Sequence, residues 1–383
     1  MIQYLEAYYL DKPLGVMSWS PECQEGRFEF YPSFLSGRTD LSPIQFSTPS
    51  LNDKPPVLTF TKKNDRLIGL PPFLIDCQPG EYAMKLLRCA LKSSGKTPEI
   101  LSPLALCSLL GKRALGVICF EPCGYPELDM VEPVDISRLV RYAKTVYQET
   151  DDSLTENRLR ELLRSGLFTT ANRPEALLAV NDYTGEICSG QAGIPSGFEA
   201  WTLVIDGVVP NEGNKLNVKY NQHKKAKACG LDVLPCRQIR EGTRTHLLIK
   251  RLDRDKEKKI HFQSFAALRD EPADSCEAVF RCMRLLRLPY PEQVEFFKRV
   301  VFNELTINRQ DNAKSILFTC LDHHEWHLAP TSGIVASTGN GLSVRGKIRN
   351  LTTEDLLELG RQQHIRKCRE IIEEVQSSLT AVT

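Results

Sequence analysis

The sequence predicts an α+β fold in which β-rich segments come first and helices dominate the C-terminal part. Two observations support this order. Short segments with alternating apolar residues, such as Phe28 and Phe30, occur before about Gly111 and are typical of strands. Beyond Cys276, apolar residues recur at helical spacing over long segments. The chain has 383 residues, which is too long for one simple core and predicts two or three packing units.

The N-terminal part is expected to contain strands, turns and a few helices. Strands are predicted over residues 26–32, 55–65 and 112–122. Residues 80–92 have apolar residues at helical spacing and predict a short helix. Asp135 can cap a helix over residues 136–148, and Ser153 with Glu156 forms a capping box before the next helix.

The middle of the chain predicts a small β segment with one helix, and the pattern beyond about Cys276 is mainly helical. Strands are predicted over residues 176–181, 186–190, 199–206 and 245–253. Residues 215–229 predict a helix that ends at Gly230, because glycine readily adopts the left-handed conformation found at helix ends. Further helices are predicted over residues 277–286, 292–308, 352–363 and 367–379.

Composition excludes membrane-spanning and disordered proteins. The chain is 42% apolar and 25% charged, which is ordinary for a globular protein, and no apolar segment approaches membrane-spanning length. The opening residues mix acids with apolar residues, so we expect no signal peptide. The net charge of +1 gives no overall attraction to nucleic acid or anionic lipid, so such binding would need a local patch.

The 13 cysteines predict free thiols in a reducing cytoplasm. Their number is odd, and no two of them form a C-x-x-C pair. Disulfide frameworks favour even counts in short secreted chains, and structural zinc sites need closely spaced pairs. We therefore expect core thiols and no metal site.

Five blocks of sequence point to one protein family. They are residues 6–37, 185–207, 245–268, 302–318 and 324–334. Together and in this order they resemble the HipA family of toxin–antitoxin serine/threonine kinases. The resemblance implies a bilobal kinase fold with an extra N-terminal subdomain over residues 1–148, a small lobe over 149–270 and a helical C-terminal lobe over 271–383.

The resemblance also assigns kinase positions, and most of them carry residues of the wrong chemical type. Val204 stands where the family has its phosphate-binding lysine, and Lys219 where it has the glutamate that pairs with that lysine. Gln310 replaces the catalytic aspartate. Ser315 and Gly333 replace the asparagine and the aspartate that hold Mg²⁺.

The phosphate-binding loop of the family is also altered. Its glycine-rich sequence is replaced here by a segment that includes Thr170, Asn172 and Arg173, and its lysine position is Glu175. Loss of one well-placed electrostatic group typically slows a reaction by about 100- to 1,000-fold. The chain is therefore interpreted as a pseudokinase with no catalytic residues, for which neither ATP nor Mg²⁺ is expected as a cofactor.

Two features keep alternatives open. Asp311 follows the expected catalytic position, so it is either a surrogate base or an exposed loop acid beside Arg309. Adenine in this fold is held by backbone groups of the hinge, which the resemblance places at Lys250, Arg251 and Leu252. Nucleotide could therefore still bind there, and the alternative is an empty or collapsed cleft.

The helix over residues 215–229 carries a basic stripe. Lys215, Lys219 and His223 recur every four residues, and Lys224 and Lys227 lie alongside. The stripe is either a solvated surface or a contact site for an acidic partner, with nucleic acid bound at most indirectly.

Lys219 would need a partner of opposite charge, because the resemblance places it inside the cleft. A lysine in an apolar environment needs a partner, and Glu175 is the natural candidate. A pair of this kind would block the nucleotide site from within.

The favoured function is a catalytically inactive HipA-like pseudokinase that acts as a binding or regulatory module in a bacterial toxin–antitoxin-like system. Its expected partners are a helix-turn-helix antitoxin-like repressor or an active kinase relative, and no membrane. One alternative is an active serine/threonine kinase toxin of atypical mechanism that phosphorylates a translation component. Another is a scaffold or effector that reuses the fold for protein–protein contact.

Overall fold

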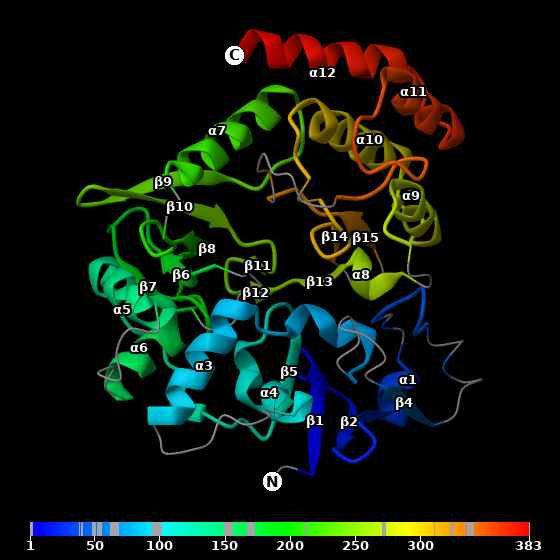
Figure 1. Ribbon diagram of the computed structural model, residues 1–383. Helices are drawn as coiled ribbons and strands as arrows, with labels where there is room; N and C mark the ends of the chain where they lie inside the picture. The colour runs from blue at the N-terminus through cyan, green and yellow to red at the C-terminus, as the bar shows by residue number, and fades with distance from the viewer. Residues whose placement is uncertain are drawn as a thin grey trace. The chain divides into compact units, whose positions relative to one another are not determined.

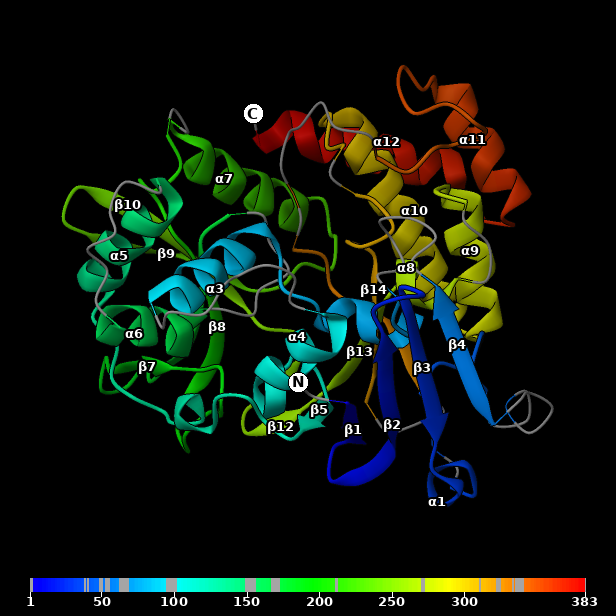
Figure 2. The same cartoon turned by 60° about the horizontal axis from the view of Figure 1, so that its bottom comes forward.

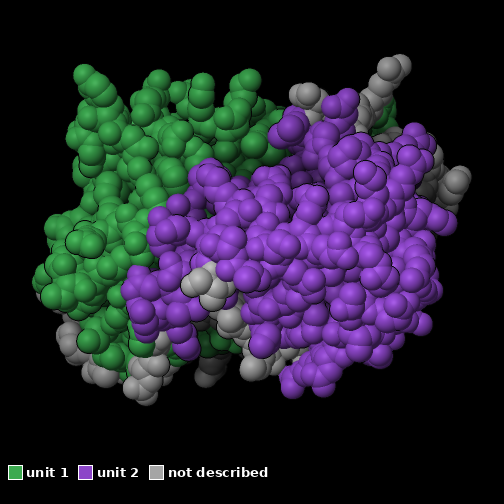
Figure 3. All heavy atoms as spheres, turned by 90° about the horizontal axis from the view of Figure 1, so that it is seen from above, with its two compact units in different colours: residues 1–39, 48–213, 237–261 green, residues 40–47, 214–236, 262–383 purple. Residues whose placement is uncertain are grey.

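The computed structural model shows a chain of helices and small sheets (Figure 1). It describes residues 3–37, 39, 41–47, 51, 56–61, 69–93, 102–148, 156–166, 173–210, 213–269, 273–309, 311–321, 325–332, 334 and 341–382. The chain forms two compact units, coloured separately in Figure 3. Unit 1 contains residues 1–39, 48–213 and 237–261, and unit 2 contains residues 40–47, 214–236 and 262–383.

Unit 1 contains a five-stranded sheet in the order β4-β3-β2-β1-β5, whose neighbouring strands are antiparallel (Figure 2). The strands are β1 (Tyr4–Tyr9), β2 (Lys12–Ser20), β3 (Glu25–Phe30), β4 (Val57–Thr61) and β5 (Ile118–Glu121). Phe28 and Phe30 point to the same side of β3, are both buried and pack against Phe73. The alternation of the two phenylalanines thus marks the core face of the sheet, as the sequence predicts.

Several helices also belong to unit 1. They are α1 (Pro32–Leu35), α3 (Glu81–Ser93), α4 (Pro103–Leu110), α5 (Ile136–Gln148) and α6 (Glu156–Gly166), with 3₁₀ turns over Pro72–Cys77, Gly111–Arg113 and Pro126–Leu128. The predicted cap of α5 is confirmed, because Asp135 accepts a hydrogen bond from the backbone N–H of Arg138. The predicted capping box before α6 begins at Ser153, which lies outside the described residues.

A second sheet of unit 1 has the order β7-β6-β8-β10-β9. Its strands are β6 (Glu175–Val180), β7 (Ile187–Ser189), β8 (Glu199–Val204), β9 (Cys236–Glu241) and β10 (Arg244–Lys250). β8 lies in the middle and pairs antiparallel with both β6 and β10. The small strands β11 (Arg254–Asp255) and β12 (Lys258–Lys259) form a separate hairpin.

Unit 2 is mainly helical. It contains α7 (Lys215–Ala228), α8 (Phe265–Leu268), α9 (Cys276–Leu285), α10 (Tyr290–Leu305), α11 (Thr353–Gln362) and α12 (Cys368–Val382). The strands β13 (His261–Ser264), β14 (Leu317–Cys320) and β15 (Trp326–Leu328) form a three-stranded sheet. β14 and β15 lie in the part of the chain where the sequence pattern is otherwise helical. The large aromatic core includes Phe280 and Phe296, whose ring centroids are 5.0 Å apart.

The predicted α+β class is confirmed by this mixture of sheets and helices. The finer division into three segments, 1–148, 149–270 and 271–383, stays a prediction. Within the described part of the chain, no helix combines the length and the apolar character needed to cross a membrane.

Candidate functional site

Val204 lies at the end of β8 and is completely buried. Its direct cross-strand neighbours are Glu175 of β6 and Leu247 of β10. The sheet thus holds a branched apolar side chain at the position where the family resemblance requires a lysine. A valine offers no charge to a phosphate group, so this position cannot perform the electrostatic role of that lysine.

The segment before β6 lies beside the end of β8. The backbone N–H of Ile205 donates to the carbonyl of Pro174 at 3.2 Å, and the guanidinium of Arg173 donates to the carbonyl of Ile205 at 3.2 Å. Arg173 and Glu175 are therefore held at the edge where the resemblance places a phosphate loop. Thr170 and Asn172 of that loop lie outside the described residues.

The predicted hinge begins at Lys250, the last residue of β10, and its first two residues are engaged with β8 and its neighbourhood. The backbone N–H of Arg251 donates to the carbonyl of Ala200 at 3.1 Å, and Lys250 forms an ion pair with Glu199 at 2.8 Å. This backbone donor of Arg251 is therefore already used within the protein. Adenine binding by the other backbone groups of Lys250 and Leu252 stays a prediction.

The side chain of Arg251 belongs to a buried charge cluster centred on Asp253. The Asp253 carboxylate accepts hydrogen bonds from Arg251 at 2.8 Å, from Arg254 at 2.6 Å and from the backbone N–H of Gly116 at 3.1 Å. Burial disfavours the ionised carboxylate, but the two guanidinium groups outweigh it and hold the pKa of Asp253 well below its ordinary value. Burial also lowers the pKa of Arg254 to about 10. This cluster fixes the chain after β10, and sequence analysis did not identify Asp253 as its centre.

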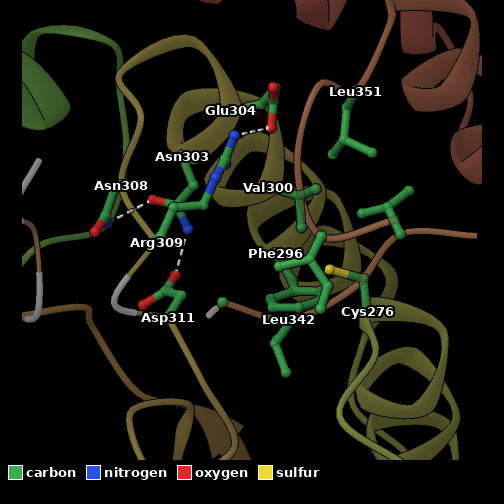
Figure 4. A pocket seen from close by; sticks show the side chains of 13 residues that line it. Cys276, Phe296, Val300, Asn303, Glu304, Asn308, Arg309, Asp311, Leu342 and Leu351 are labelled. Atoms are coloured by element: carbon green, nitrogen blue, oxygen red, sulfur yellow. Dashed lines mark hydrogen bonds and ion pairs between the residues drawn. The ribbon is translucent and has the colours of Figure 1, made fainter. Parts of the chain in front are cut away.

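In unit 2, a chain of hydrogen bonds connects α10 to the loop that follows it (Figure 4). The Asn308 amide donates to the Asn303 Oδ1 at 2.8 Å, and the Asn303 amide donates in turn to the Asp311 carboxylate. Arg309 forms an ion pair with Glu304 at 2.7 Å. Gln310, the residue at the predicted catalytic position, lies outside the described residues.

Asp311 is buried, with a residue exposure of 7%. It lines a small cavity of about 30 Å³ together with Cys276, Phe296 and Leu342 (Figure 4). Burial raises the pKa of Asp311, although the hydrogen bond from Asn303 and the charge of Arg299 oppose this shift. The expectation of an exposed loop acid is therefore wrong, because the carboxylate is turned toward α10 and anchors the loop.

Ser315 forms part of a tight turn in the same loop. Its hydroxyl accepts a hydrogen bond from the backbone N–H of Asn312 at 2.8 Å and donates to the Asn312 carbonyl at 3.0 Å. A serine hydroxyl engaged in this way is a poor substitute for the amide oxygen that the family uses for Mg²⁺. Gly333, at the other predicted metal position, lies outside the described residues. Among the residues that the structure describes, no cluster of three or more His, Cys, Asp or Glu side chains could hold a metal ion.

Helix α7 carries the basic stripe, and the structure corrects one of its members. His223 is 3% exposed, and its Nε2 lies 2.9 Å from the carbonyl oxygen of Ser332. Burial lowers the pKa of His223, which favours the neutral ring that donates to this carbonyl. His223 therefore anchors a loop and is not part of an exposed basic surface, because it lies on the side of α7 that faces the core of unit 2.

The lysines of the stripe differ in exposure. Lys215, Lys224 and Lys227 are exposed, whereas Lys219 is half-buried. The first three are placed to meet a partner or solvent. The pairing of Lys219 with Glu175 stays a prediction, and so does the role of the exposed lysines.

Comparison with known proteins identifies what the chain resembles. Residues 215–382 match the model of the HipA-like C-terminal domain family. No curated protein matches the chain. Among solved structures, the chain is similar to a chain of the toxin–antitoxin complex of HipA, HipB and operator DNA from Shewanella oneidensis MR-1, with 12% identity and a TM-score of 0.64. This similarity covers 99% of the present chain and 90% of that chain.

A second solved structure, the proinflammatory kinase CtkA of Helicobacter pylori, is similar over 56% of the present chain and 89% of its own, with 12% identity and a TM-score of 0.38. The resemblance to the HipA family that the sequence predicts is confirmed over residues 215–382 by the domain match, and the Shewanella structure shows that the fold is shared.

Proposed function

We propose that this chain, whose residues 215–382 form a HipA-like C-terminal domain, is a non-catalytic HipA-like protein that acts by binding in a bacterial toxin–antitoxin system. Val204 is the observation that carries the proposal. It is completely buried at the end of the central strand β8, and the family resemblance implies a phosphate-binding lysine at this position. A kinase that lacks this cation loses a main source of transition-state stabilisation.

The loop after α10 supports the same proposal. The Asp311 carboxylate accepts a hydrogen bond from Asn303 and is buried, so it is poorly placed to take a proton from a substrate hydroxyl. The hydroxyl of Ser315 is engaged with the backbone of Asn312. The described residues of this loop therefore act as structural anchors of the turn, while the active-kinase alternative requires one of them to act as a base or a metal ligand.

The proposed role is recognition of a protein partner in the cytoplasm. The similar Shewanella structure is a complex of HipA with HipB and operator DNA. By analogy, we propose that the present chain binds a helix-turn-helix antitoxin-like repressor, or competes for one with an active kinase relative. Neither Mg²⁺ nor ATP is required for this role.

Copurification from the native host tests the binding role. The full-length chain carries an affinity tag and is isolated with and without added Mg·ATP. Stoichiometric recovery of a helix-turn-helix protein or of an intact HipA-like kinase, independent of nucleotide, is the expected result. Recovery of the chain alone, together with phosphate transfer to a translation component, would overturn the proposal and support an atypical kinase toxin.

A further inference from the structure

Lys259 and Cys119 form a close pair in unit 1, beside the buried charge cluster of Asp253, because Lys259 is the cross-strand neighbour of Arg254. Cys119 lies on β5, and Lys259 lies on β12. The Lys259 Nζ is 3.4 Å from the Cys119 Sγ and also donates to the carbonyl of Lys112 at 3.0 Å. The side-chain amine is thus held beside the sulfur by a second hydrogen bond rather than extended into solvent.

The surroundings favour a reactive amine at this position. Burial lowers the pKa of Lys259, and the charge of nearby Arg254 acts in the same direction, while Cys119 and Asp253 oppose it. A lysine with a lowered pKa spends more time as the neutral amine, which is the nucleophilic form. Cys119 itself is only partly buried, which is compatible with access by a small oxidant.

A competing thiol lies in the same region but is poorly suited to react. Cys77 is buried and interacts electrostatically with both Cys119 and Lys259. Burial raises the pKa of Cys77 well above its ordinary value, which keeps it as the unreactive thiol. The Lys259 amine, 3.4 Å from the Cys119 sulfur, is therefore a better placed nucleophile for an oxidised Cys119 than the Cys77 thiol.

We propose that Cys119 and Lys259 form a reversible covalent cross-link when the protein meets hydrogen peroxide. In the first step the Cys119 thiol reacts with one peroxide molecule, giving a sulfenic acid and one water. In the second step the Lys259 amine attacks the sulfur, so that a sulfur–nitrogen bond forms and a second water leaves. The sulfur loses two electrons in total, and peroxide accepts them.

The cross-link would join β5 to the β11–β12 hairpin, two segments separated by 140 positions in the chain. A bond between such distant positions restricts the unfolded chain and so stabilises the folded one. Thiols reverse it, because a thiol attacks the sulfur and releases the amine. The proposal is independent of whether the chain transfers phosphate.

Peptide mapping of the full-length protein tests the cross-link. The protein is treated with peroxide, remaining thiols are alkylated, and a protease that cuts after glutamate separates the two residues at Glu121 and Glu257. The expected product is a linked pair of peptides, lighter by two hydrogens than the sum of its parts and released by dithiothreitol. The oxidised protein should also melt at a higher temperature than the reduced one.

Neighbouring residues supply the controls. Lys259→Arg keeps the positive charge but removes the nucleophilic amine, so the linked peptide should fall to background. Lys258→Arg changes the exposed neighbour on the same hairpin and should leave the yield unchanged. Cys23, which is exposed, should oxidise without forming a link in every variant.

Three results would overturn the proposal. One is a parent protein in which Cys119 proceeds to sulfinic acid with no linked peptide. Another is a disulfide between Cys119 and Cys77 in place of the lysine link. The third is a linked peptide that persists in Lys259→Arg. Should that variant fail to fold, Cys119→Ser must still lack both the link and the peroxide-dependent rise in melting temperature.

Discussion

Replacing Asp311 with alanine should destabilise the protein, because it removes an acceptor from the loop after α10. The Asn303 amide donates to the Asp311 carboxylate, and the Asn303 Oδ1 is already used by Asn308. In Asp311→Ala the Asn303 amide loses its acceptor. Leaving a buried donor unpaired costs about 1–3 kcal/mol, and the half-buried position of Asn303 places the expected loss near the lower end.

The matched variant Asp311→Asn keeps an acceptor oxygen and removes the charge. It should be at least as stable as the parent at neutral pH, since burial raises the pKa of Asp311 and thereby disfavours its ionised form in the folded state. The folded protein then holds this proton more tightly than the unfolded chain. Stability is therefore lost as pH rises from the ordinary value of 3.8 through the raised folded value, and Asp311→Asn should lack this loss.

Urea unfolding of the parent and both variants measures these differences. The slopes of the transitions should match, so that the midpoints report stability directly. The result that refutes the reasoning is an Asp311→Ala variant as stable as the parent, or an Asp311→Asn variant with the same pH dependence as the parent. The first result would show that the carboxylate does not anchor the loop, and the second that Asp311 is not the source of the pH dependence.

Three further predictions concern other buried positions. Val204→Lys should lower the free energy of unfolding in urea by several kcal/mol, because it places a charge at a completely buried site. Thr202→Lys, at a half-buried position of the same strand, should cost much less, and equal losses for the two variants would contradict this prediction. Asp253→Ala should lower the free energy of unfolding by about 3–5 kcal/mol, because two buried guanidinium groups lose their carboxylate partner. A loss below about 1 kcal/mol would show that this charge cluster does not stabilise the fold. The lowered pKa of His223 predicts that the protein loses stability as pH falls below the ordinary pKa of 6.5, which thermal unfolding measures. His223→Gln should remove that loss. If the variant loses stability in acid as the parent does, His223 is not the source of the effect.

Much of the fold could be predicted from local patterns, and the exceptions have physical causes. The amphipathic helices α5 and α9 show clear periodicity and were predicted near their observed bounds. Helix α4 was missed, because its residues are apolar on nearly all sides and leave no periodic signal, although Ser102 caps it through the backbone N–H of Ala105. The strands β14 and β15 are short and give no local signal, since three or four residues carry little alternation, so only the family resemblance indicates strands there.

The candidate site was predictable as a set of positions but not as a set of contacts. Val204 lies in a strand that the sequence predicts and the structure shows, whereas the kinase positions assigned to Val204 and Ser315 stay predictions. The resemblance could not reveal that His223 faces inward, since a histidine at helical spacing suits either face of α7. Nor could it reveal the partners of Asp311 and Asp253, because these contacts depend on residues that tertiary folding brings together.

The most direct test of the account is phosphate transfer by the purified full-length chain. The protein is incubated with radiolabelled ATP and Mg²⁺, alone and with a translation extract, and incorporation is compared with that of Asp311→Asn, which is expected to fold normally. The account predicts incorporation no higher than that without protein, for both. Magnesium-dependent incorporation by the parent that is lost in Asp311→Asn would contradict it and make Asp311 the base of an active kinase.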